Sequence, residues 1–118
     1  MADSRHINAD SEIVLVMSTF SDLSTTEICA RHLVEHSHAA CVQIDGPIRS
    51  VYKWKGNIKN DEEFRLHIKT SPETLDRCVL ALKENHPYEL PEIVVLHADA
   101  SAAYASWVTE QTFGKEKD

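Results

Sequence analysis

The sequence has little glycine, proline or aromatic residue: 3 Gly, 4 Pro and 7% Phe, Trp and Tyr in 118 residues. This composition excludes a collagen-like or low-complexity chain and leaves few positions for sharp turns. No apolar run is long enough to span a bilayer, and the N-terminal stretch has no apolar segment of the kind that a secretory signal needs. We therefore expect neither a membrane helix nor a secretory signal.

Positive charge is also scarce. The 12 Lys and Arg residues are outnumbered by 19 Asp and Glu residues, which gives a formal net charge of −7. Binding to a phosphate backbone needs a basic face, so nucleic acid is not the expected partner. The length suits one domain. We expect a disordered lead over residues 1–11, a single domain over 12–113 and a tail over 114–118.

The three cysteines, Cys29, Cys41 and Cys78, are widely spaced and odd in number. Without a CxxC pair they suggest neither a zinc knuckle nor a disulfide framework. Cys29 and Cys78 fall in helical patterns and Cys41 at an apolar strand start, so we expect buried free thiols. Free thiols indicate a reducing compartment, and we expect the protein in the cytoplasm.

The first half of the chain reads as strand, helix, strand, strand. A continuous apolar run over 13–20 predicts a buried strand, and Ser24-Thr25-Thr26-Glu27 predicts a capping box for a helix to about residue 37. Residues 40–54 predict a long strand that Gly46-Pro47 bends. Strict alternation over 62–70 predicts the next strand.

The second half reads as helix, strand, helix. Ser71-Pro72-Glu73 predicts a helix start, residues 93–98 predict the last core strand, and a short helix begins at Ser101. The order βαββαβ plus a C-terminal helix predicts an α+β fold of the ferredoxin-like, split-βαβ type. Right-handed crossovers then place two helices on one face of a four-stranded antiparallel sheet.

The other sheet face has no helix to cover it. Tyr52, Trp54, Phe64 or Ile68 must find cover there, and a hairpin over 40–70 would project past the body as a two-stranded ribbon. Partner subunits can cover both features. We therefore expect an oligomer.

The stretch Asn85-His86-Pro87-Tyr88-Glu89-Leu90-Pro91-Glu92 gathers the most polar groups on stiff backbone. Its two prolines fix two φ angles and remove two backbone donors, so the helix cannot continue through it. An imidazole, a phenol and two carboxylates on such a link can form a small site. Alternatively, His86 only caps the last carbonyls of the preceding helix.

Six short and distinctive blocks of residues follow one another along the chain. They are Ala39-Ala40-Cys41, Ile48-Arg49-Ser50-Val51-Tyr52-Lys53-Trp54-Lys55-Gly56, Ile68-Lys69-Thr70, His86-Pro87-Tyr88, Pro91-Glu92 and Tyr104-x-x-Trp107. With this set, residues 13–108 resemble the CutA-type divalent-cation tolerance protein family. The resemblance implies a ferredoxin-like fold, a tight homotrimer, a cytoplasmic location and a role in tolerance of copper and other divalent metals. The family is not known as an enzyme family.

The resemblance also implies metal ligands: a cysteine near the end of the first strand and a His-His pair before Pro-Tyr. Here those positions hold Ser18 and Asn85, so only His86 remains. Serine is a poor ligand for soft metals, and an amide oxygen binds copper weakly. We expect no tightly held cofactor, and only weak binding of copper or another divalent cation by His86 with Glu92 or Glu89.

Two other groups are candidates. Lys69, Tyr88, Trp54 and Trp107 form a predicted subunit seam that binds a small molecule or anion, the alternative being an intersubunit salt bridge through Lys69. His32 and His36 have the i, i+4 spacing that chelates a metal on a helix, with His38 nearby, the alternative being a solvated helix face.

Three further functional classes are compatible with this fold. PII-like sensors use a long loop between the second and third strands and bind phosphates, but here that link is only residues 55–61 and no glycine-rich cradle follows. An acylphosphatase-like hydrolase needs an arginine after the first strand, where Ser21 and Asp22 stand. A structural scaffold for partner proteins needs no site at all. We therefore expect a non-enzymatic, metal-responsive trimer, with PII-like sensing and scaffolding as alternatives.

Overall fold

The computed structural model describes residues 7–112, and the side chains of residues 11–112. Its elements are β1 (Ile7–Phe20), α1 (Leu23–Glu35), β2 (Cys41–Trp54), β3 (Asn57–Thr70), a 3₁₀ turn η1 (Pro72–Thr74), α2 (Leu75–Glu84), β4 (Val94–Ser101) and α3 (Ala102–Thr112). This is the predicted order of elements. None of the helices in this part of the chain has the length and apolar character needed to cross a bilayer.

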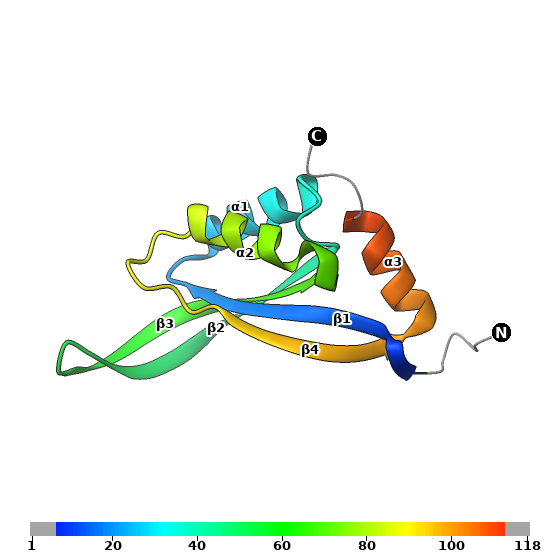
Figure 1. Cartoon of the computed structure of the whole chain (residues 1–118). Coiled ribbons are helices and arrows are strands. Elements are labelled where there is room, and N and C mark those ends of the chain that lie inside the picture. The colour runs from blue at the N-terminus through cyan, green and yellow to red at the C-terminus, as the bar shows by residue number, and fades with distance from the viewer. Residues whose placement is uncertain (1–6, 113–118) are drawn as a thin grey trace.

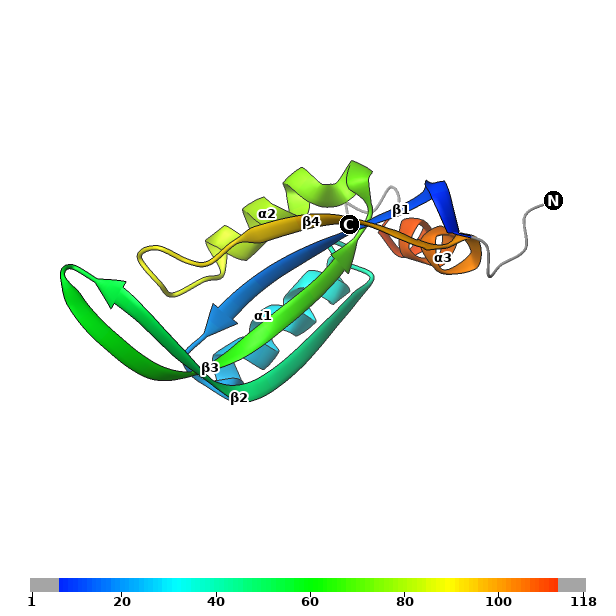
Figure 2. The ribbon, with the colours of Figure 1, turned by 90° about the horizontal axis from the view of Figure 1, so that it is seen from below.

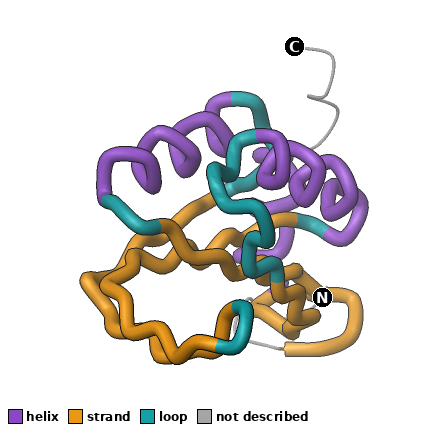
Figure 3. Tube along the Cα trace, turned by 90° about the vertical axis from the view of Figure 1, so that its left-hand side faces the viewer, coloured by secondary structure: helices purple, strands orange, loops and turns teal. Residues whose placement is uncertain are grey.

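The four strands form one antiparallel sheet in the order β2-β3-β1-β4. Helices α1 and α2 lie together on one face of that sheet, and α3 packs near its end (Figure 1). The end-on view shows the same two layers, with helices on one side and strands on the other (Figure 3). The ferredoxin-like α+β prediction is therefore confirmed.

The core fills the space between the sheet and the two helices. Alternate residues of β1 point toward the helices, and Val16 pairs there with Ile68 of β3. The fully buried members are Val14, Val16, Phe20, Cys29, Leu33, Leu66, Ile68, Cys78 and Leu82. Burial raises the pKa of the Cys29 thiol to about 11 and that of Cys78 to about 12, so both are unreactive free thiols, as predicted. Cys41 is only half-buried.

Two predicted strand starts are wrong. Strand β1 begins at Ile7, which pairs with Ser101, so residues 7–11 belong to the sheet rather than to a disordered lead. Strand β3 begins at Asn57 rather than at 62, because hairpin pairing with β2 extends it through a polar stretch. The other predicted terminal segments, residues 1–6 and 114–118, lie outside the described residues.

One of the two predicted helix starts is corrected, and the other is confirmed. The N-cap of α1 is Asp22, whose Oδ1 accepts the Thr25 N–H at 2.7 Å, and not the box beginning at Ser24. The start predicted at Ser71-Pro72-Glu73 is confirmed: Ser71 is the N-cap of η1, which runs directly into α2. The Ser71 hydroxyl makes no cap hydrogen bond and bonds instead to Thr74 and Thr112.

The sheet face opposite α1 and α2 carries no helix over its centre, and Figure 2 shows the strands in front of both helices. The residues there include Leu15 paired with Leu96, and Met17 paired with Val94. Leu96 is 47% exposed and Val94 40%. The predicted open face therefore exists, but Ile68 does not lie on it, because its side chain is fully buried beneath the helices.

The β2–β3 hairpin bends at Gly46 and then projects as a ribbon (Figure 1). The register shifts between Asp45 and Ile48, and Gly46 has φ +145°. A Cβ there would meet Phe64 at 2.7 Å, so only glycine fits without a shift. Beyond the bend, Val51 and Ile58 are more than two-thirds exposed. The ribbon thus presents apolar side chains that this chain does not cover.

Candidate functional site

The stiff link over residues 85–92, here called the joint, begins where α2 ends. Asn85 closes the helix: its side-chain amide donates to the Ala81 carbonyl at 2.8 Å. Pro87 cannot continue the helix, because it lacks the N–H and its ring clashes with the preceding turn. The chain therefore turns back, and His86 reaches the end of β1.

His86 uses both ring nitrogens. Its Nε2 lies 2.9 Å from the Thr19 carbonyl oxygen and 3.1 Å from Ser18 Oγ, while Nδ1 lies 3.2 Å from the Tyr88 backbone nitrogen. A carbonyl only accepts and an amide N–H only donates, so the proton sits on Nε2 and Nδ1 accepts. His86 is therefore a neutral imidazole with no lone pair free for a metal ion in this arrangement.

Packing holds His86 in that state. Its ring stacks on Phe20 with centroids 4.1 Å apart and an interplanar angle of 23°, and the Tyr88 ring meets it edge-on at 4.8 Å. Burial lowers the pKa of His86, and the Thr19 carbonyl and the Glu63 carboxylate only partly offset that effect. The imidazole thus stays neutral at pH 7. Its ring nitrogens bond to β1 and to Tyr88 and not to the carbonyls of α2, so the alternative of a capping side chain is wrong.

A buried carboxylate lies beyond Tyr88. The Tyr88 hydroxyl donates to Glu63 Oε2 at 2.7 Å, and Glu63 is only 7% exposed. Burial, followed by the Glu63 carboxylate, raises the pKa of Tyr88 far above its usual range. Glu63 has no signal in the sequence, because the local pattern places it on the polar side of an alternating strand and gives no sign of Tyr88.

A groove of about 900 Å³ lies between the ribbon and the joint. It contains aromatic side chains, carboxylates and one ammonium group. Its lining is Thr19, Ser50, Val51, Tyr52, Lys53, Trp54, Glu63, Tyr88, Glu89, Leu90, Pro91 and Glu92. Apolar walls with a few polar groups are typical of ligand sites and of sites that take a side chain from another subunit.

The structure separates the predicted seam residues into two pairs within one chain. Trp54 and Tyr88 line the groove. Lys69 instead lies 5.6 Å from the ring centroid of Tyr104, which also contacts Trp107 at 5.6 Å. Because Trp54 pairs with the first residue of β3 and Lys69 lies near its last, the two are roughly 40 Å apart at strand spacing. The four residues can form one seam only across neighbouring copies.

The predicted metal ligands are likewise not gathered. Glu92 lines the groove, whereas His86 turns toward Ser18 and Thr19. Among residues 11–112, no three His, Cys, Asp or Glu side chains converge as a metal cluster. The pairing of His86 with Glu92 therefore stays a prediction.

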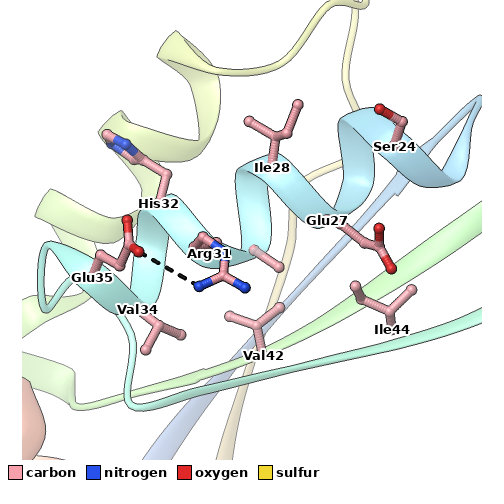
Figure 4. Close-up of a pocket in the computed structure, with 10 residues that line it drawn as sticks. Ser24, Glu27, Ile28, Arg31, His32, Val34, Glu35, Val42 and Ile44 are labelled. Carbon is pink, nitrogen blue, oxygen red and sulfur yellow. Dashed lines mark ion pairs between the residues drawn. The ribbon is translucent and has the colours of Figure 1, made fainter.

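A second groove, of about 810 Å³, lies between α1 and the edge strand β2 (Figure 4). Val34, Val42 and Ile44 form its apolar floor, and an ion pair at 3.6 Å joins Arg31 to Glu35 on its rim. Figure 4 shows His32 pointing away from this floor. This groove is separate from the joint and shares no lining residue with the first one.

A helix-covered antiparallel sheet in this order, with an open second face, defines a small ferredoxin-like α+β protein. The family profile described as "CutA1 divalent ion tolerance protein" matches residues 14–111. The chain therefore belongs to the CutA1 divalent ion tolerance family.

Relatives and solved structures agree with this assignment. The divalent-cation tolerance protein CutA of Thermus thermophilus is 35% identical over 102 residues, covering 86% of this chain and 97% of its own. CutA from Synechococcus elongatus superposes with a TM-score of 0.84 at 34% identity, covering 91% of this chain and 96% of that one. A Nostoc structure described as a PII-like protein CutA in apo form has a TM-score of 0.79 at 33% identity, covering 84% and 96%.

Proposed function

We propose that this protein is a cytoplasmic, non-enzymatic homotrimer that takes part in the response to divalent metal ions, copper among them. We propose further that its joint binds Cu²⁺ only weakly, through His86 and Glu92. The observation that carries the proposal of weak binding is the engagement of both His86 nitrogens. An ion at His86 must break one of these hydrogen bonds, and Ser18 offers no soft sulfur in return.

The open sheet face supports the trimer. Leu96 and Val94 lie on β4, an edge strand, where exposed apolar groups and unpaired backbone favour association. The projecting ribbon adds the exposed Val51 and Ile58. Subunits that cover both features would bury well above ~1,000 Å² at each contact, the size of a stable interface.

Light scattering on the purified protein at micromolar concentration tests the assembly. The expected mass is three times the 13.3 kDa of one chain. Trp54→Ala is expected to loosen the trimer, because the indole stands near the tip of the ribbon. A monomer mass for the unmodified protein would contradict the proposal. An unchanged mass and melting temperature in Trp54→Ala would contradict only the placement of the indole against a neighbour.

Calorimetric titration of metal-stripped protein and of His86→Ala with Cu²⁺ tests the joint. We expect any binding that His86→Ala removes to be micromolar or weaker, about −8 kcal/mol or less favourable. Nanomolar binding that disappears in His86→Ala would show that the imidazole is available after all.

The groove between the ribbon and the joint supports a second candidate, PII-like sensing of a small molecule or anion at a seam completed by Lys69 and Trp107 of neighbouring copies. Its aromatic walls are suited to a planar ligand. Titration with ATP, followed by tryptophan fluorescence, tests this directly. A change in the unmodified protein that Lys69→Ala abolishes supports sensing, and no change at millimolar ATP removes ATP as the ligand.

A further inference from the structure

Three imidazoles gather at the C-terminal end of α1, far along the chain from the joint. The ring centroids of His32 and His36 are 4.2 Å apart, and His38 lies 5.9 Å from the first and 6.1 Å from the second. We propose that His32 and His36 form a binding site for a divalent transition-metal ion that prefers imidazole, such as Cu²⁺, Ni²⁺ or Zn²⁺. This site shares no residue with the metal ligands proposed at the joint.

The spacing brings the two rings to one side of the helix. Residues i and i+4 lie one above the other on an α-helix, so two imidazoles there can reach the same ion. His32 lies at the edge of the groove beside β2 but points away from its apolar floor (Figure 4), and none of the hydrogen bonds among the described residues uses its ring nitrogens. The short distance between the rings shows that both side chains already lie on this side of α1.

The hydrogen bonds leave the lone pairs that a metal needs. His36 Nδ1 lies 3.0 Å from the His32 carbonyl oxygen. Since a carbonyl only accepts, Nδ1 carries the proton and Nε2 carries the lone pair. This is the usual state of a ligating histidine, whose second nitrogen donates to a backbone carbonyl that fixes the ring. The His32 ring has no hydrogen-bond partner among the described residues, so a lone pair of this ring is available to the same ion.

The local field also favours a cation at this end of α1. His32 and His36 stand at the last turn and C-cap of the helix, where the helix dipole places partial negative charge. Glu35 adds a carboxylate in the same turn, although it pairs with Arg31 on the groove side. The ion would therefore sit at the negative end of the helix.

His38 defines the limit of the site. Its Nδ1 lies 3.4 Å from Arg77 Nη1, and Arg77 also donates to the Ser37 carbonyl at 3.2 Å. Burial and then the Arg77 charge lower the pKa of His38, so this ring is neutral. The same guanidinium repels a cation from Nδ1. The ion therefore sits on the His32–His36 side, and since the three rings do not converge on one point, His38 contributes through a bound water at most.

The test is calorimetric titration of the metal-stripped full chain with NiCl₂ and CuCl₂ at pH 7.5. Variants His32→Gln and His36→Gln remove one ligand each, and His67→Gln is the matched control, because His67 is partly exposed but pairs with Asp45 on the sheet. We expect each ligand variant to bind at least ~10-fold more weakly, or about 1.4 kcal/mol. His38→Gln should change the affinity less than either, and His67→Gln should leave it unchanged.

Affinity that stays unchanged in both His32→Gln and His36→Gln overturns the proposal. An equal loss in the His67→Gln control overturns it too, because binding would then be spread over surface histidines. Circular dichroism confirms that each variant is folded. A parallel titration of His86→Ala separates this site from the joint: binding that depends on His86 alone contradicts the α1 site, and binding that depends on His32 and His36 alone leaves the joint without measurable affinity.

Discussion

Histidines stand in two opposite settings in this chain. At the joint, His86 donates to Thr19, accepts from Tyr88 and stacks on the buried Phe20. At the end of α1, the rings of His32 and His36 lie 4.2 Å apart and tilted by 30°, and only the carbonyl of His32 engages a ring nitrogen. The same side chain is thus part of the packed structure in one place and available in the other.

A histidine beside a stiff, polar link is therefore not always available as a metal ligand. A histidine can bind a metal ion tightly only if tertiary contacts leave one of its ring nitrogens free. At the joint, tertiary contacts use both nitrogens of His86. His86 is part of the motif that resembles the metal-tolerance family, but its contacts in this chain are structural. The histidine pair on α1 has fewer local signals of function but keeps its lone pairs.

The largest change in stability is expected when His86, and not His32, is replaced by alanine. His86→Ala removes the stacking on Phe20 and leaves the Thr19 carbonyl without its donor. We expect a loss of about 3 kcal/mol in the free energy of unfolding. The matched variant His32→Ala should cost no more than ~1 kcal/mol, because this half-buried ring makes no hydrogen bond among the described residues.

Urea denaturation at one fixed protomer concentration measures both variants, because assembly makes stability concentration-dependent. Similar losses of unfolding free energy in His86→Ala and His32→Ala would show that the two histidines do not differ in their structural role.

A double variant at the joint should turn it into a metal-binding site. Ser18→Cys places a sulfur where the serine oxygen now lies 3.1 Å from His86 Nε2, and Asn85→His restores the second imidazole. We expect this double variant to bind copper more than ~10-fold more tightly than the parent, about 1.4 kcal/mol. Calorimetry against the single variants checks this, and an unchanged affinity would mean that the joint cannot open to an ion.

Acid should weaken the fold through two half-buried imidazoles, His86 and His38. The pKa values of His86 and His38 are lowered in the folded state, so the unfolded chain binds more protons as pH falls. The stabilisation is present above the ordinary histidine pKa of ~6.5 and is lost as pH drops through the folded values. We expect a lower melting temperature at pH 5.5 than at pH 7.5, and a smaller difference in His38→Gln. A melting temperature that is higher at pH 5.5 than at pH 7.5 would contradict this prediction.

The smallest expected effect concerns His36. Replacing it with glutamine removes the imidazole but keeps a donor that can reach the His32 carbonyl. The free energy of unfolding should change by less than ~0.5 kcal/mol, while metal binding falls as described above. Thermal melts in the absence of metal check this, and a large destabilisation would show that His36 is structural like His86.

The sequence predicts the elements well, because their patterns report local burial. The alternation over 62–70 and the apolar run over 13–20 indicate strands that the structure confirms. The β-α-β-β-α-β order then leaves few topologies, since crossovers have a fixed hand.

The site is less predictable, because its contacts join residues far apart in the chain. Glu63 meets Tyr88 from a strand that reads as polar, and His86 meets Ser18 and Thr19 from the other end of the fold. No local pattern signals either contact. The same applies to β1, whose first residues are ordered by pairing with Ser101.

The central claim is that His86 is occupied by the protein itself, whereas the imidazoles of α1 are free to bind an ion. NMR of the histidine rings in ¹⁵N-labelled protein, titrated with substoichiometric Cu²⁺, tests it most directly. We predict that the His32 and His36 signals broaden first while His86 stays sharp, with its proton on Nε2. Broadening of His86 before or together with the α1 histidines would contradict the account.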